Sequence, residues 1–156
     1  MKGKPEVISA LSDMLKEELG AVSQYFLHAE MMENWGYKRL SDLTKKQSIG
    51  EMKHAEAIME RILFLEGLPN MNEIGKIKIG KDVPQQIAND LELEKSAVAA
   101  YNKAVELCRK AGDNATADFL KEILKDEEEH VDFLETQLSL IDQLTLPIYL
   151  TEQMKG

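Results

Sequence analysis

The chain has 156 residues and a mass of 17.6 kDa, a size that suits one domain. Hydrophobic residues make up 44% of it and charged residues 30%, a balance that fills a core and argues against wholesale disorder. The formal charge of −9 repels phosphate backbones, so we expect no nucleic acid partner. No apolar run approaches the roughly 18 residues that cross a bilayer, so we expect no membrane partner either.

Cysteine and the first residues bear on the compartment. A single cysteine, Cys108, excludes an internal disulfide framework and any site built on Cys-x-x-Cys pairs. One reduced thiol fits a cytosolic protein. The polar first residues, Met1–Pro5, lead into an amphipathic pattern with no sign of a signal peptide. We therefore expect a cytoplasmic protein.

Hydrophobic residues recur at steps of three and four in four long runs, which predicts four helices. Proline and glycine mark the ends of the runs. The expected helices cover about residues 5–35, 39–66, 83–111 and 114–143, with a short helix at about 146–153. The connection 67–82 reaches about 53 Å at ~3.3 Å per residue, the length of a bundle.

The connection between the second and third runs decides the topology. Because it is long enough to return along the bundle, we expect residues 1–156 to form a single all-α domain, a four-helix bundle with one long crossover loop and a short fifth C-terminal helix. An up-down bundle with a flexible loop is the alternative.

Glutamate takes one position near the middle of each apolar run, where leucine, isoleucine and valine fill the neighbouring steps. These residues are Glu18, Glu51, Glu94 and Glu127. Burying a lone carboxylate is costly, so buried carboxylates pair with another charge or bind metal. His54 and His130 each follow a glutamate by three residues, which puts each pair on one helix face.

The chain repeats these groups at a shift of 76 residues, for the single glutamates and for both Glu-x-x-His pairs. Two helix pairs related by an approximate two-fold axis would bring four carboxylates and two imidazoles together. Four negative charges balance two divalent ions, and this donor set suits iron, manganese or zinc. The pattern is that of di-iron carboxylate proteins. A buried glutamate–histidine network without metal is the alternative.

Two tyrosines share faces with these donors. Tyr25 follows Glu18 by seven residues and Tyr101 follows Glu94 by seven, about two helical turns. Two Fe(II) ions held a few ångströms apart each give one electron to O2. Either tyrosine is expected to supply a further electron or to order the carboxylates, and simple core packing is the alternative for each.

Two aspartates lie close to the predicted donors in sequence. Asp90 precedes Glu94 by one helical turn, and Asp126 directly precedes Glu127. Ligating histidines in metalloproteins usually donate their second N–H group to a carboxylate or carbonyl. Both aspartates are therefore candidate acceptors for these N–H groups.

Taken together, these residues resemble the bacterioferritin family. The resemblance also rests on the stretches 24–28, 61–69 and 146–150 and covers essentially the whole chain. It implies a ferritin-like fold. The implied di-iron ligands are Glu18, Glu51, His54, Glu94, Glu127 and His130.

The resemblance further implies iron storage and detoxification. A ferroxidase centre in each subunit would oxidise Fe(II) to Fe(III) with O2 or H2O2. The ferric mineral would be stored in a hollow homo-oligomeric shell of 24 subunits built from twelve dimers.

A b-type haem at each dimer interface, bound by one methionine from each subunit, is also implied. It would pass electrons from a small ferredoxin to the mineral for iron release. Met52 matches the haem-ligand position, and one residue past Glu51 it turns about 100° away from the metal seam. Interface packing is the alternative for Met52, and also accounts for Met31 and Met59.

This chain departs from the family pattern in two places. Some members carry a histidine and an acidic residue on the cavity-facing side where this chain has Lys46 and Gly50, so the route of iron into the core differs or is open. Some members carry tyrosine and tryptophan in place of Ile58 and Phe133. Their absence leaves Tyr25 as the better candidate for a catalytic radical role.

Two other functions remain open from the sequence. One is a di-iron oxygenase or peroxidase of small oligomeric state, although the form that resembles rubrerythrin needs Cys-x-x-Cys pairs that this chain lacks. The other is a haem-binding electron carrier without ferroxidase activity, whose Glu-x-x-His pairs are only structural. Size separates a shell of about 420 kDa from a dimer of about 35 kDa.

Overall fold

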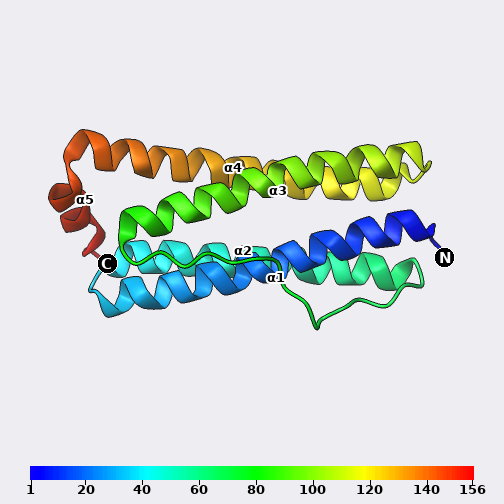
Figure 1. Cartoon of the computed structure of the whole chain (residues 1–156), viewed down its shortest axis with the longest axis horizontal. Coiled ribbons are helices and arrows are strands. Elements are labelled where there is room, and N and C mark those ends of the chain that lie inside the picture. Colours follow the sequence, from blue (N-terminus) through cyan, green and yellow to red (C-terminus); the bar gives the residue numbers. More distant parts are fainter.

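The computed structural model describes all 156 residues and contains five helices and no strand. The helices are α1 (Pro5–Asn34), α2 (Lys38–Phe64), α3 (Val83–Lys110), α4 (Asn114–Leu144) and α5 (Leu146–Gln153). The four long helices form a bundle, and α5 packs across one end (Figure 1). The predicted all-α bundle with a short fifth helix is confirmed.

The long connection sets the direction of the second helix pair. Residues 65–82 leave the end of α2, run along the bundle and start α3 at the opposite end (Figure 1). Helices α2 and α3 therefore point the same way, which excludes the up-down alternative. Each of the pairs α1–α2 and α3–α4 forms an antiparallel hairpin.

The helix ends lie within two residues of the expected positions. The largest difference is at α2, which ends at Phe64 because Glu66 adopts a left-handed conformation with φ of 64°. The N–H group of Gly67 then donates to the carbonyl of Ile62 at 2.9 Å and closes the helix end. Gly36 and Gly112, with φ of 91° and 81°, supply the same left-handed turn after α1 and α3.

Aspartates cap the two helices of the second hairpin. Asp82 accepts a hydrogen bond from the backbone N–H of Gln85 at 2.9 Å, and Asp113 accepts one from Thr116 at 3.0 Å. Each carboxylate satisfies an N–H group that the first turn leaves without a partner, and its charge suits the positive end of the helix dipole.

Two apolar clusters fill the two halves of the bundle. The larger one lies where α1 and α4 start and α2 and α3 end; its residues are Val7, Ala10, Leu11, Met14, Leu15, Ala55, Ile58, Ile62, Leu65, Tyr101, Ala104, Cys108, Ala117, Leu120 and Ile123. The smaller one lies at the α5 end; its residues are Met32, Leu40, Val83, Ile87, Leu134 and Tyr149. Buried polar residues occupy the space between the two clusters.

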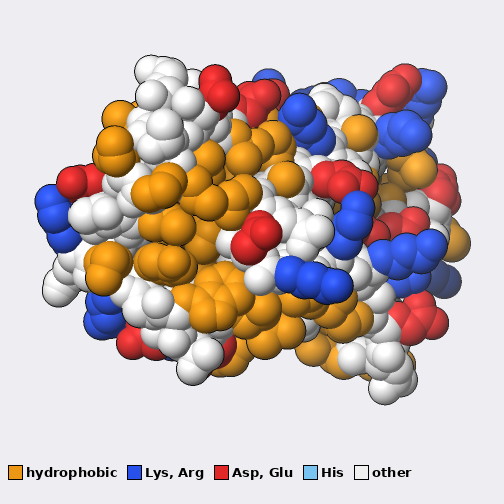
Figure 2. Space-filling model, turned by 60° about the vertical axis from the view of Figure 1, so that its left-hand side comes forward, with side chains coloured by type: hydrophobic (Ala, Val, Ile, Leu, Met, Phe, Trp, Pro, Cys, Tyr) orange, Lys and Arg blue, Asp and Glu red, His pale blue; other side chains and the backbone are white.

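Part of the surface is also apolar. Figure 2, turned to bring the α5 end forward, shows hydrophobic side chains gathered over a broad area. Trp35, Leu144 and Ile148, from the elements that meet at this end, are exposed. Contiguous apolar surface of this kind is typical of an interface with another molecule. No helix is both long enough and apolar enough to span a membrane.

Candidate metal centre

The six donors predicted from the sequence converge between the four long helices. Their ligand atoms form two groups, each with all atoms within 4.8 Å of one another. The first group is Glu18, Glu51, His54 and Glu127, and the second is Glu51, Glu94, Glu127 and His130. Glu51 and Glu127 belong to both groups. The arrangement is that of two adjacent cation positions that share two carboxylates.

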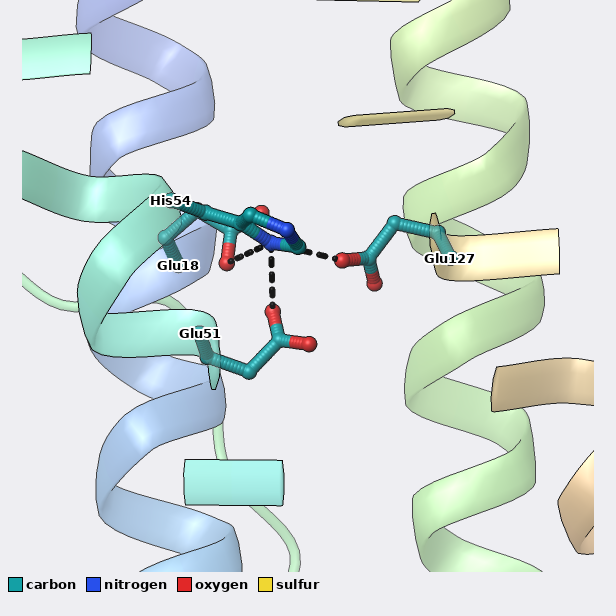
Figure 3. A group of neighbouring side chains, drawn as sticks. All are labelled: Glu18, Glu51, His54 and Glu127. Carbon is teal, nitrogen blue, oxygen red and sulfur yellow. Dashed lines mark ion pairs between the residues drawn. The ribbon is translucent and has the colours of Figure 1, made fainter. Parts of the chain in front are cut away.

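The first group is drawn in Figure 3. Carboxylates from α1, α2 and α4 all point toward the imidazole of His54. The distances from His54 Nδ1 are 3.1 Å to Glu127 Oε1, 3.6 Å to Glu18 Oε2 and 3.7 Å to Glu51 Oε2. In the second group, His130 Nδ1 lies 3.0 Å from Glu51 Oε1.

These donors are buried and yet incompletely hydrogen-bonded. The four glutamates are at most 2% exposed. Each of the six residues keeps one buried atom without a hydrogen-bond partner: Glu18 Oε2, Glu51 Oε1, His54 Nδ1, Glu94 Oε2, Glu127 Oε1 and His130 Nδ1. Because buried polar atoms in native proteins are almost always satisfied, such a set fits bound metal ions better than a self-contained network.

The crowded carboxylates shift one another's pKa. Burial and the hydrogen bond with Glu94 raise the pKa of Glu127 to about 11. Burial and Glu18 raise the pKa of Glu51 well above its usual range. Burial alone would also raise the pKa of Glu94, but hydrogen bonds with Glu127 and His130 outweigh it and lower that pKa. Without metal, the carboxylates therefore share protons, and cations replace those protons on binding.

The two histidines differ in their outer contacts. His54 Nε2 lies 2.8 Å from Asp126 Oδ2, as expected for Asp126 from the sequence. A proton on Nε2 would be held by this carboxylate, which leaves Nδ1 facing the cation position. The residue equivalent to Asp126, 76 positions earlier, is Gly50, so no side chain there can support His130 in the same way.

The histidines also carry shifted pKa values. Burial alone would lower the pKa of His54, but its hydrogen bonds with Glu127, Glu18 and Glu51 outweigh burial and raise it. Burial likewise works downward on His130, and the neighbouring carboxylates of Glu94 and Glu127 raise its pKa. Both shifts reflect the surplus of negative charge that two divalent cations would neutralise.

The two tyrosines bind the two unshared carboxylates. Tyr25 donates its phenol O–H to Glu94 Oε1, and Tyr101 donates its own to Glu18 Oε1, both at 2.5 Å. Burial, followed by the charge of the bonded glutamate, raises the pKa of both phenols well above the usual value. Both phenols therefore stay protonated.

Asp90, by contrast, does not contact a donor histidine, so that interpretation of the sequence was wrong. Its Oδ1 accepts a hydrogen bond from Gln24 Nε2 at 2.8 Å and lies 2.9 Å from His28 Nδ1. His28 Nε2 accepts from the N–H of Gly80 at 3.0 Å, and Gln24 Oε1 accepts from the N–H of Lys78 at 2.9 Å. Asp90 thus anchors the crossover loop.

Met52 points away from the metal centre. It is 52% exposed, and Phe26 and Ile49 expose large apolar side chains on the same pair of helices. A soft thioether with exposed apolar neighbours fits the axial position and flat apolar faces of a haem. Lys46 is exposed on α2, and Gly50 is partly buried there.

Comparisons with known proteins agree with this geometry. The family model of the ferritin-like domain matches residues 8–144. A bacterioferritin of Mycobacterium leprae is 44% identical over 149 residues, which are 96% of this chain and 94% of the relative. A bacterioferritin of Brucella melitensis is 44% identical over 92% of this chain and 89% of the relative. One of Streptomyces coelicolor is 40% identical over 97% and 90%.

Proposed function

Because the chain belongs to the bacterioferritin family, we propose that it stores iron and oxidises Fe(II) to Fe(III) at a di-iron centre inside each subunit. O2 or H2O2 is the oxidant, and the ferric product is stored in a hollow shell of 24 subunits. The observation that carries this proposal is the set of six buried donor atoms without partners, arranged as two overlapping groups.

The donors divide into terminal and shared roles. Glu18 and His54 belong to one cation position alone, and Glu94 and His130 to the other, while Glu51 and Glu127 bridge the two. The four carboxylates offset the charge of two Fe(II) substrate ions and favour the higher charge of Fe(III). The bound iron supplies one electron per ion to the oxidant. The protons held by Glu51 and Glu127 leave as the ions bind.

Substrate reaches the centre past the histidines. The side chains of His54 and His130 are 13% and 16% exposed, whereas the glutamates are at most 2% exposed. The histidines lie on α2 and α4, so we assign the entrance to the side of the bundle that these helices form. Asp126 is 53% exposed beside His54 and adds negative charge there, which attracts cations.

Met52 is proposed to bind haem b together with Met52 of a second subunit. Two thioether ligands favour the reduced iron and raise the haem potential, which suits electron transfer from a small ferredoxin for iron release. The Met52→Leu variant should lose haem absorbance after reconstitution. Met154→Leu, which changes an equally exposed methionine on the far side of α5, should retain it. Retention of haem by both variants would contradict this assignment.

Aerobic addition of Fe(II) tests the oxidation. We expect fast growth of ferric absorbance in the wild type and a loss of about 100-fold or more in rate for Glu94→Ala and Glu127→Ala. Glu128→Ala, which changes the exposed neighbour of Glu127, should behave as the wild type. No acceleration over free solution, or equal rates in all variants, would leave a haem-binding electron carrier as the better account.

Light scattering tests the shell. A mass of about 420 kDa supports storage. A dimer of about 35 kDa that still oxidises Fe(II) would favour a small di-iron oxygenase or peroxidase.

A further inference from the structure

Two buried phenols occupy equivalent places around the centre. Tyr25 and Tyr101 are 76 residues apart, as are the glutamates that they bind. Both hydrogen bonds measure 2.5 Å, and the two side chains are 1% and 0% exposed. The approximate two-fold symmetry of the donors therefore extends to the tyrosines.

Each phenol is one carboxylate away from one cation position. Glu18 gives Oε1 to Tyr101 and leaves Oε2 without a partner, and Glu94 gives Oε1 to Tyr25 and leaves Oε2 without a partner. Because Glu18 and Glu94 are the two glutamates that the cation positions do not share, each position has a phenol of its own.

The electron count of the reaction gives this pairing a role. Reduction of O2 to two waters takes four electrons, and two Fe(II) ions supply only two. We propose that Tyr25 and Tyr101 act as a pair of one-electron donors, one beside each iron position, so that a single centre reduces O2 fully to water. This inference rests on the proposed Fe(II) oxidation and deepens it.

The step balances as 2 Fe(II) + 2 TyrOH + O2 + 2 H⁺ giving 2 Fe(III) + 2 TyrO• + 2 H2O. In each tyrosine the phenol O–H bond breaks, its proton passes to the bonded carboxylate oxygen, Oε1 of Glu94 or Glu18, and its electron passes toward the iron. Those two protons and two from solvent complete the waters. Two further Fe(II) ions, with two protons, then restore both phenols, so four Fe(II) are consumed per O2.

The surroundings of the phenols support electron transfer coupled to this proton movement. Because burial keeps both phenols protonated, an electron leaves only if the proton moves too, and each carboxylate oxygen lies at hydrogen-bond distance to accept it. Tyr101 is part of the larger apolar cluster, and Tyr25 is equally closed to solvent. Both sites shield a radical from water.

Rapid freezing after mixing Fe(II)-loaded protein with O2, followed by electron paramagnetic resonance, tests the pair. The wild type should show a tyrosyl radical signal that is broader with ordinary tyrosine than with deuterated tyrosine. Tyr25→Phe and Tyr101→Phe should each keep about half of it, because two separate donors contribute independently. The double variant should lose the signal. Tyr149→Phe, which removes a buried phenol bonded to Gln137, should leave it unchanged.

Product analysis gives a second readout. The wild type and Tyr149→Phe should consume about four Fe(II) per O2 and release little H2O2, whereas the double variant should consume about two and release H2O2. Calorimetric Zn(II) titration of each variant confirms that the cation positions persist. If Tyr101→Phe matches the wild type in radical yield and stoichiometry, Tyr101 only orients Glu18 and the inference fails. If the wild type itself does not oxidise Fe(II), the proposed function fails instead.

Discussion

The two halves of the bundle differ in chemistry although an approximate two-fold axis relates them. On the α5 side of the metal centre the buried residues are polar, and on the other side they are apolar. Residues 76 positions apart show the contrast; the pairs are Gln24 and Ala100, His28 and Ala104, and Asp90 and Met14. The donors themselves, by contrast, match in pairs.

The crossover loop explains the difference. It passes over the polar half only, and its extended backbone brings N–H groups that need acceptors. Gln24 and His28 accept from Lys78 and Gly80, and the carbonyl of Lys16 accepts from Gly75 at 2.8 Å. The lesson is that ligand geometry imposes symmetry on the centre, while chain connectivity decides what surrounds it.

Truncation in the apolar half should have the largest effect. Leu120→Ala empties space in the larger cluster and should lower the free energy of unfolding by about 3–4 kcal/mol. Thr44, the equivalent residue in the polar half, is bonded to Met32 Sδ, and Thr44→Ala should cost about 1 kcal/mol. Scanning calorimetry compares the two midpoints. Equal shifts would show that the halves do not differ in packing.

Metal loading should stabilise the halves together, because the centre joins all four long helices. Zn(II) at a hundred times its Kd should raise the free energy of unfolding by about 2.7 kcal/mol, and a chelator should reverse the gain. Thermal midpoints and hydrogen exchange of both halves measure this effect. The same gain in Glu127→Ala would place the Zn(II) elsewhere.

Loss of the buried aspartate should affect the polar half alone. Asp90→Ala leaves donors of Gln24 and His28 without an acceptor and should cost about 2 kcal/mol. The backbone N–H groups of Lys78 and Gly80 should then exchange faster with deuterium. Met14→Ala, at the equivalent apolar position, should lower stability without changing exchange in the loop. Unchanged exchange in Asp90→Ala would mean that the network does not hold the loop.

The smallest effect concerns the cap at the apolar end. Asp113→Ala should cost about 1 kcal/mol at neutral pH. Partial burial acts to raise the pKa of Asp113, but hydrogen bonds from Thr116 and the charge of Arg61 outweigh it and lower that pKa. A lowered folded-state pKa stabilises above the unfolded value and is lost as pH falls through the folded value.

The difference in stability between the wild type and Asp113→Ala should therefore shrink below about pH 4. Denaturation at a series of pH values measures it, with Asp113→Asn as the variant that keeps a capping oxygen. A difference that grows toward acid pH would contradict the sign of the shift.

The fold and the placement of the donors could be predicted because their signals are local. Helical periodicity, the helix-ending residues and a glutamate within each apolar run are all visible within a few turns of sequence. The end of α2 was less accurate, since it depends on Glu66, not a glycine, adopting the left-handed conformation.

The anchoring network could not be predicted in the same way. His28 and Gln24 lie on the face of Tyr25, but their partners are in a loop more than 50 residues later, whose path follows from the assembled bundle. Asp90 was assigned to a donor histidine for the same reason, because spacing gives its helix face and not its partner.

Anomalous X-ray diffraction at the iron edge, on crystals soaked anaerobically with Fe(II), tests most directly whether six dispersed side chains hold a metal pair. We predict two peaks in each subunit, about 3.5–4 Å apart, with Glu51 and Glu127 between them. No peak among these donors, or iron bound only by carboxylates at the surface, would contradict the account.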